Sequence, residues 1–197
     1  TGGQRQGLTF PGGANTVGYL TYGAETWATD LGRNTSNPAT FAFRAWIVST
    51  GSNSIAARND GNTVSAGWQI DHAGGSLVST HESSSVNMYC TVSAFPTARW
   101  ITVVIVTDGS LTAANQRIYA DGILQAHAVD SNGSGTPGSD AAQTLYIGRG
   151  NAAYVANTSF DGTLAWFYAW KRMLSAAEVL LLSREPYAFV RDPAEMF

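Results

Sequence analysis

The chain has 197 residues, of which 44% are hydrophobic and 13% are charged, and its formal net charge is −3. This length fits one domain or one large β-sandwich, and the hydrophobic fraction is ample for a core. Charged residues reach only half of the usual share of about 25%, Lys and Arg form no cluster, and no apolar run approaches the roughly 18 residues that span a membrane, so the composition argues against nucleic-acid binding and membrane insertion.

Short apolar stretches recur through the first hundred residues, and turn-forming clusters separate them. Alternation in "FAFRAWIVST" (41–50) puts Arg44 and Trp46 on one face of a strand and four apolar residues on the other: Phe41, Phe43, Ala45 and Ile47. Because successive side chains of a strand point to opposite faces, this period of two predicts β-structure. Similar stretches are "GLTFPGG" (7–13), "NTVGYLTY" (15–22), "GWQIDH" (67–72), "SLVSTH" (76–81) and "SVNMYCTVSAF" (85–95).

The single cysteine, Cys90, lies in one of these strand-like stretches. One cysteine cannot form an intrachain disulfide, so folding needs no oxidising compartment, although export stays open. We expect Cys90 to be a buried structural thiol. The chain opens without a charged segment followed by an apolar one, so we expect no signal peptide in it.

The second half continues with strand-like stretches and one short hairpin. Asp121-Gly122 separates "RIY" from "ILQ", and Gly tolerates the positive φ that a two-residue hairpin turn needs. The other stretches are "WITVVIVTDG" (100–109) and "QTLYIGRG" (143–150). Strands at this spacing predict a two-sheet antiparallel sandwich.

The stretch 160–182 begins as a strand and ends as a helix. Its aromatic alternation predicts a strand with Ala165, Phe167 and Ala169 on one face and four larger residues on the other: Leu164, Trp166, Tyr168 and Trp170. Ser175 and Glu178 form a capping-box pattern, which predicts the start of a helix of about two turns. Arg184 suits the negative end of that helix and Pro186 stops it.

The order of these elements resembles the laminin-G-like, concanavalin A-like jelly roll. "RIYADG" (117–122), "LYIGRG" (145–150) and the strand-to-helix ending around "LSAAE" (174–178) carry the resemblance, which covers roughly residues 7 to 183. It implies an all-β, two-sheet antiparallel jelly-roll sandwich with one short C-terminal helix. We therefore expect a domain over residues 1–183 and an extended tail over 184–197.

Catalytic patterns are missing from the sequence. Glycosidases of this superfamily carry acidic residues that alternate along one strand, and none of the five glutamates has an acidic partner two residues away. His72 and His81 could meet across a hairpin and hold a metal, but no third ligand is indicated, so polar strand ends are the simpler interpretation. We predict that the protein is not an enzyme and needs no cofactor.

Calcium is the one ion that the resemblance brings in. Relatives often hold Ca²⁺ at the rim of the sandwich with Asp, Asn and backbone oxygens. The rim-loop candidates in this chain are Asp108, Asp130, Asn132 and Asp140. The alternative is that these residues form turns and bond to their own backbone.

Two aromatic sets are candidates for binding. If the family alignment holds, the outer concave face presents Arg44, Trp46, Trp166 and Tyr168 to a sugar or a protein neighbour, unless loops or the tail cover them. The tail adds Tyr187 and Phe189, which we expect to pack on the chain's own sandwich, and Phe197, which we expect to be available to a partner.

These features favour a surface recognition module. The tail "SREPYAFVRDPAEMF" (183–197) is similar to the endings of laminin-G-like proteins of phage virions. The first interpretation is a virion decoration or fibre-associated protein that docks on capsid or tail subunits at the virion surface. The alternative is an extracellular carbohydrate-binding module of a secreted or cell-surface protein.

Overall fold

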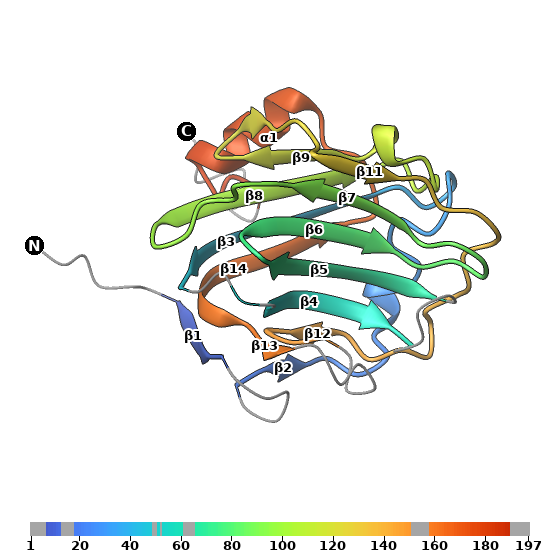
Figure 1. Cartoon of the computed structure of the whole chain (residues 1–197), viewed down its shortest axis with the longest axis horizontal. Coiled ribbons are helices and arrows are strands. Elements are labelled where there is room, and N and C mark those ends of the chain that lie inside the picture. Colours follow the sequence, from blue (N-terminus) through green and yellow to red (C-terminus); the bar gives the residue numbers. More distant parts are fainter. Residues whose placement is uncertain are drawn as a thin grey trace, which may run out of the picture.

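The computed structural model describes residues 7–12, 18–48, 51, 53–60, 66–150 and 158–189. They form two stacked β-sheets and one α-helix (Figure 1). The six-stranded sheet, here called sheet A, has the order β1-β14-β3-β8-β9-β10. Its strands are β1 (Leu8–Pro11), β14 (Asp161–Trp170), β3 (Ala39–Ile47), β8 (Trp100–Thr107), β9 (Arg117–Ala120) and β10 (Ile123–Leu124).

The eight-stranded sheet, here called sheet B, has the order β11-β7-β6-β5-β4-β12-β2. Its strands are β11 (Val129–Ser131), β7 (Met88–Val92), β6 (Ser76–His81), β5 (Gly67–Ala73), β4 (Asn53–Asn59), β12 (Tyr146–Ile147) and β2 (Leu20–Thr21). These strands pair antiparallel, and β13 (Thr158–Ser159) adds to β4 in parallel. The predicted two-sheet jelly-roll sandwich is therefore confirmed.

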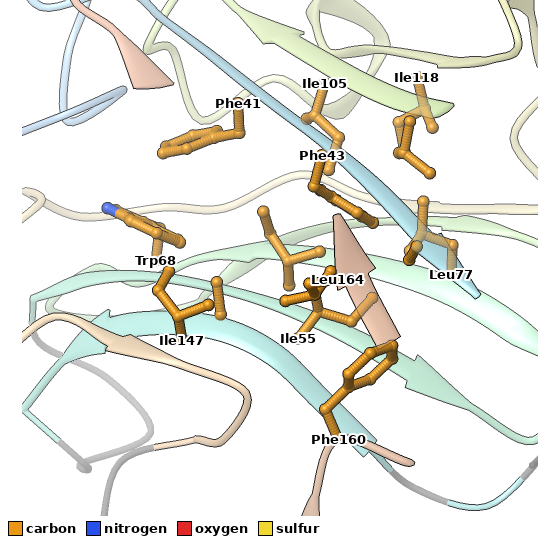
Figure 2. Packing of buried hydrophobic residues seen from close by; sticks show 14 of the residues in the cluster. Phe41, Phe43, Ile55, Trp68, Leu77, Ile105, Ile118, Ile147, Phe160 and Leu164 are labelled. Carbon is orange, nitrogen blue, oxygen red and sulfur yellow. The ribbon is translucent and has the colours of Figure 1, made fainter. Parts of the chain in front are cut away.

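The core lies between the two sheets, as the alternation in 41–50 predicts. Phe41 and Phe43 of β3 point into it, toward the side of Trp68 of β5 (Figure 2). Phe41 packs against Trp68, and Phe43 stacks with Phe167 of β14. The Trp68 ring lies 4.3 Å from the Phe41 ring and 6.4 Å from the Phe167 ring, measured between centroids. Aromatic pairs from facing sheets thus hold the two layers together.

The helix α1 (Ala176–Arg184) packs on the outer face of sheet A, beside β8 (Figure 1). Its capping box is formed, because the Glu178 amide donates to Ser175 Oγ and the Ser175 amide donates to the Glu178 carboxylate. Two 3₁₀ turns, η1 (Thr26–Ala28) and η2 (Ala113–Asn115), lie in loops. None of the helices in the described residues is long or apolar enough to cross a membrane.

The hairpin between β9 and β10 also forms as predicted. Asp121 and Gly122 have φ values of 50° and 81°, so both residues of the turn are left-handed. Cys90 is fully buried in β7, in agreement with its strand-like context.

Candidate functional site

A β-bulge in β14 decides which side chains reach the outer face of sheet A. The register with β3 shifts between Leu164 and Trp166, so that Ala165 is an extra residue. Leu164 therefore joins the inter-sheet core, while Trp166 points to the opposite face. Strict alternation placed these two residues on one face, and this prediction is wrong because a bulge reverses the alternation at the inserted residue.

Trp166, Tyr168 and Trp170 do share the outer face, but they are largely or partly covered there. They pack with Leu174, Val179 and Leu182 in a second hydrophobic cluster, and Trp166 is only 8% exposed. The expectation that both rings are fully open is therefore corrected, because Trp166 is largely covered and Tyr168 is half-buried. An apolar helix face needs an apolar surface beneath it, and in β8, against which α1 packs, Val104 and Val106 of the same cluster provide it.

One part of this face stays open and forms a groove of about 490 Å³. We call it the Arg44 groove. Its lining comes from the residue before β1, from β3, from β8, from the bulge in β14 and from the chain after α1: Gly7, Arg44, Trp100, Ala165, Trp166, Pro186 and Tyr187. The bulge places Ala165 and Trp166 at its floor, so an irregular strand shapes the site.

Arg44 is the charged group of the groove. Its guanidinium lies 5.8 Å from the centroid of the Trp100 ring, and its Nη1 donates to Thr102 Oγ1 over 3.3 Å. Within the described part of the chain it forms no ion pair with any carboxylate. A half-buried guanidinium held in this way has donors left for an anionic ligand.

Aromatic rings flank this guanidinium. Trp46, which the sequence placed beside Arg44, stands edge-on to Trp100 at 6.1 Å and is half-buried. Trp100 itself was missed. It lies opposite Trp46 in the β3–β8 register, and "RW" at the start of "RWITVV" (99–104) was the signal that could have found it.

The residues after α1 differ in their contacts. Phe189 stands edge-on to Trp170 at 5.8 Å and is half-buried, as expected of a residue that packs on the sandwich. The predicted burial of Tyr187 is wrong, because its side chain is 50% exposed. It lines the open Arg44 groove and does not pack into the sandwich. Burial and the nearby Tyr187 raise the pKa of Tyr168. Phe197 lies outside the described residues.

The four calcium candidates bond to separate protein groups. Asp108 accepts from the Ser110 amide and from Asn115, and Asn132 accepts from the Ala113 amide. The carboxylates of Asp108, Asp130 and Asp140 do not meet within the described part of the chain. The three carboxylates therefore share no cluster among the described residues, and the bond from the Ser110 amide to Asp108 is of the kind that the turn-forming alternative predicts.

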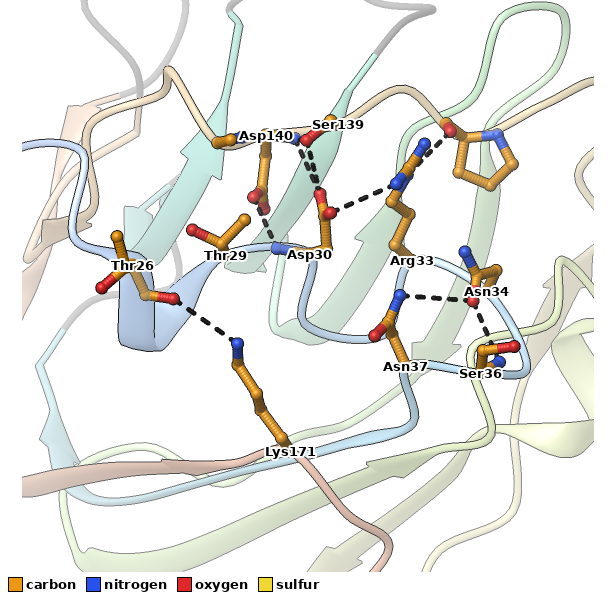
Figure 3. A network of polar contacts seen from close by, with 12 residues as sticks. Thr26, Thr29, Asp30, Arg33, Asn34, Ser36, Asn37, Ser139, Asp140 and Lys171 are labelled. Carbon is orange, nitrogen blue, oxygen red and sulfur yellow. Dashed lines mark hydrogen bonds and ion pairs between the residues drawn. The ribbon is translucent and has the colours of Figure 1, made fainter.

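Asp140 shows most clearly why such a residue is unavailable to a metal. Its Oδ1 accepts from the Asp30 amide over 2.7 Å and pairs with the buried Arg58 guanidinium over 3.3 Å. The contact is reciprocal, since Asp30 Oδ1 accepts from the Asp140 amide and from the Ser139 hydroxyl (Figure 3). This reciprocal pair fixes the two loops at one end of the sandwich.

The two histidines do not meet across the β5–β6 hairpin. His72 lies opposite Leu77 and His81 lies opposite Trp68, four residues apart along the register. His81 bonds to the Gly32 carbonyl and to Gln116, and burial lowers its pKa to about 4. His81 is therefore a neutral, bonded core residue.

A polar row on the outer face of sheet B was not predicted. Asp71 accepts from Ser54 over 2.6 Å and from Gln69 over 2.7 Å, and Asn59 bridges Gln69 to Glu82. Burial raises the pKa of Asp71 to about 6, and burial together with the Asp60 carboxylate raises the pKa of Glu82 to about 8. These hydrogen bonds run within the row, and Glu82 is only 4% exposed.

Comparison with known proteins agrees with the fold. The family model for the concanavalin A-like lectin/glucanases superfamily matches residues 21–180. A Ruminococcus gnavus sialidase CBM40 bound to α2,3-sialyllactose superposes with a TM-score of 0.62 at 14% identity, over 91% of this chain and 97% of that one. A search of curated proteins finds no match.

Two further solved structures share the fold. A heptameric pentraxin from Limulus polyphemus has a TM-score of 0.60 at 17% identity, over 89% of this chain and 80% of that one. The binding domain of botulinum neurotoxin DC, in complex with rat synaptotagmin II, has a TM-score of 0.62 at 15% identity, over 89% of this chain. This chain spans 42% of that domain. The family match covers most of the sequence, and the chain belongs to the concanavalin A-like lectin/glucanase superfamily.

Proposed function

We propose that the protein is a non-catalytic binding module that holds an acidic glycan in the Arg44 groove. One observation carries the proposal: an open groove presents the Arg44 guanidinium beside flat aromatic rings, with no described carboxylate paired to it. Of the two functions that the sequence favours, carbohydrate binding is the one that this geometry supports better.

The chemistry of the groove fits a carboxylated sugar. A guanidinium binds a carboxylate with two parallel hydrogen bonds, which a neutral sugar cannot provide. The apolar faces of sugar rings pack against aromatic rings, and Trp100 and Tyr187 supply such rings on the walls of the groove. Its volume of about 490 Å³ also lies in the range of small-molecule sites.

The lining also favours binding without chemistry. Glycoside hydrolysis needs two carboxyl groups on either side of the scissile bond. Among the described residues that line the Arg44 groove there is no Asp or Glu. A glycan held here would meet a cation and aromatic rings but no acid or base, so we expect it to be released unchanged.

The similar structures support the same class of ligand. The R. gnavus domain is described as bound to α2,3-sialyllactose, which carries one carboxylate. A botulinum neurotoxin type C structure, 13% identical to this chain, is described as depending on two ganglioside molecules for cell entry. These ligands belong to those proteins, and they indicate which glycans to offer first.

A glycan array tests the proposal. We expect retention of sialylated or uronic-acid glycans and weak retention of their neutral counterparts. Arg44→Gln should reduce the acidic signal at least tenfold, because an amide cannot form the charged pair. Arg117→Gln, on β9 outside the groove, is the matched control and should bind as the wild type does.

Two results would overturn the proposal. One is an array on which no acidic glycan is retained by folded wild-type protein. The other is retention that Arg44→Gln and Arg117→Gln reduce equally. Tyr187→Ala gives a further check, since this exposed residue can be truncated without opening the core, and we expect weaker retention from it.

A protein partner is the second candidate, and an apolar depression favours it. Between the edges of the two sheets lies a cavity of about 340 Å³ with four exposed apolar residues at its rim: Leu8, Leu20, Tyr22 and Trp27. The finer role on a virion surface, with capsid or tail subunits as partners, stays a prediction. Co-sedimentation of the protein with purified capsids or tails tests it, and Trp27→Ser should abolish that co-sedimentation while leaving glycan binding unchanged.

A further inference from the structure

A thiol, an imidazole and a carboxylate meet at the edge of sheet B. None of the three residues lines the Arg44 groove. Cys90 of β7 and Asp130 of β11 are directly opposite in the antiparallel register, so their side chains lie on the same face. His127 lies three residues before Asp130, and its Nδ1 is 2.7 Å from Asp130 Oδ1. The Cys90 sulfur, a His127 ring nitrogen and an Asp130 oxygen all lie within 4.8 Å of one another.

These three groups are the ligand types that zinc takes in proteins. Zn²⁺ is bound by Cys sulfur at about 2.3 Å, by His nitrogen at about 2.0–2.1 Å and by carboxylate oxygen at about 2.0–2.2 Å. In a tetrahedron, these bond lengths separate the ligand atoms by about 3.2–3.6 Å. The three atoms lie within 4.8 Å of one another, and His127 Nδ1 and Asp130 Oδ1 are 2.7 Å apart, so ligation needs this pair to open and the sulfur to adjust. Side-chain rotations of about 1 Å at a strand edge can provide these shifts.

The arrangement also offers a way in for an ion. The Asp130 side chain is 42% exposed and that of His127 is 11% exposed, while Cys90 lies behind them in the core. An ion can therefore reach the carboxylate and the imidazole from solvent at the edge of the sheet. The sulfur would then bind it from the buried side of the site. A water molecule would complete four ligands on the open side.

The metal-free site holds the thiol in its neutral form. Burial, and next the Asp130 carboxylate, raise the pKa of Cys90 to about 12, and the sulfur donates to the Ala113 carbonyl over 3.3 Å. A nucleophilic role for this Cys-His-Asp group is disfavoured, because nucleophilic cysteines have lowered pKa values. A divalent cation would instead replace the thiol proton, release it to solvent and offset the repulsion between sulfur and carboxylate.

We propose that Cys90, His127 and Asp130 form a zinc-type site that fixes edge strand β11 to β7. Among the described residues this is the only such group of three or more His, Cys, Asp or Glu ligand atoms. Calcium does not suit it, because a hard cation prefers six to eight oxygens and this group offers a thiol and an imidazole. Asp130, predicted from the sequence as a calcium ligand, thus belongs to a softer donor set.

Cobalt substitution tests the site directly. Full-length protein, stripped with a chelator, is titrated with Co²⁺ under reducing conditions. We expect one equivalent to bind, with a sulfur-to-cobalt charge-transfer band and the intense visible bands of tetrahedral cobalt, and Zn²⁺ should displace it. Asp130→Asn and His127→Gln should weaken Co²⁺ binding at least tenfold, and Cys90→Ser should remove the charge-transfer band.

Asp108→Asn is the matched control, since it makes the same change in another rim-loop aspartate outside the group, and it should bind Co²⁺ as the wild type does. Because Cys90 is buried, Cys90→Ser could unfold the domain, and the two edge variants then decide the question. Absence of the charge-transfer band from folded wild-type protein would overturn the proposal. So would Co²⁺ binding that neither Asp130→Asn nor His127→Gln weakens.

Discussion

Glu82 gives a direct test of the polar row on sheet B. The residue follows β6, its Oε1 accepts from Asn59 over 3.1 Å, and burial and Asp60 raise its pKa from an ordinary 4.5 to about 8. Between these two values the folded protein holds a proton that the unfolded chain has lost. The stabilising contribution is therefore complete below pH 4.5 and is lost as the pH rises toward 8.

The size of the effect follows from this window. Each pH unit in which only the folded state is protonated changes the free energy of unfolding by about 1.4 kcal/mol. From pH 4.5 to about pH 7, Glu82 alone should remove about 3 kcal/mol of stability. Glu82→Gln keeps the shape and stays neutral, so it should be more stable than the wild type by about 2–3 kcal/mol near pH 7 and equally stable near pH 4.5.

Urea unfolding at a series of pH values measures this difference. The free energy of unfolding of the wild type should fall with rising pH more steeply than that of Glu82→Gln. The variant should still lose some stability with rising pH, because burial also raises the pKa of Asp71, to about 6. Glu25→Gln, at an exposed position, is the control and should follow the wild type. Parallel curves for the wild type and Glu82→Gln would show that Glu82 is not protonated in the folded protein near pH 7.

Three further substitutions follow from the same structure. Arg58→Met removes a fully buried guanidinium that pairs with Asp140 and donates to the Glu25 carbonyl, so it should lower the free energy of unfolding by about 3–5 kcal/mol, and an unchanged melting temperature would contradict this. Ser175→Ala opens the capping box of α1 and should cost about 1 kcal/mol in urea unfolding, whereas Ser175→Thr should keep most of it. Phe189→Ala removes the ring that packs on Trp170 and should lower the melting temperature, whereas Tyr187→Ala should leave it near that of the wild type. An equal decrease in melting temperature for both variants would contradict this difference in packing.

Local signals predicted the parts of the fold that local chemistry controls. The capping box at Ser175 and Glu178 has a fixed spacing, and the Asp121-Gly122 turn needs only residues that tolerate a positive φ. Both features can therefore be predicted from a short stretch of sequence. The alternation in 41–50 predicted the core face of β3 because a regular strand has a fixed period.

The parts that failed depend on contacts between distant residues. The bulge at Ala165 breaks the alternation in β14, and nothing in "LAWFYAW" (164–170) marks it. Trp166 is covered because it packs in a cluster with residues that follow β14, such as Leu174, and strand periodicity does not encode this packing. The grouping of Cys90 with Asp130 likewise follows from the β7–β11 register, which connects residues 40 positions apart.

The Arg44 groove is tested most directly by calorimetric titration of the wild type and Arg44→Gln with α2,3-sialyllactose, with lactose as the neutral ligand. We expect the wild type to bind sialyllactose at least tenfold more tightly than lactose, and we expect Arg44→Gln to lose this preference while Arg117→Gln keeps it. Equal affinity of the wild type for the two sugars, or a preference that survives Arg44→Gln, would contradict the account.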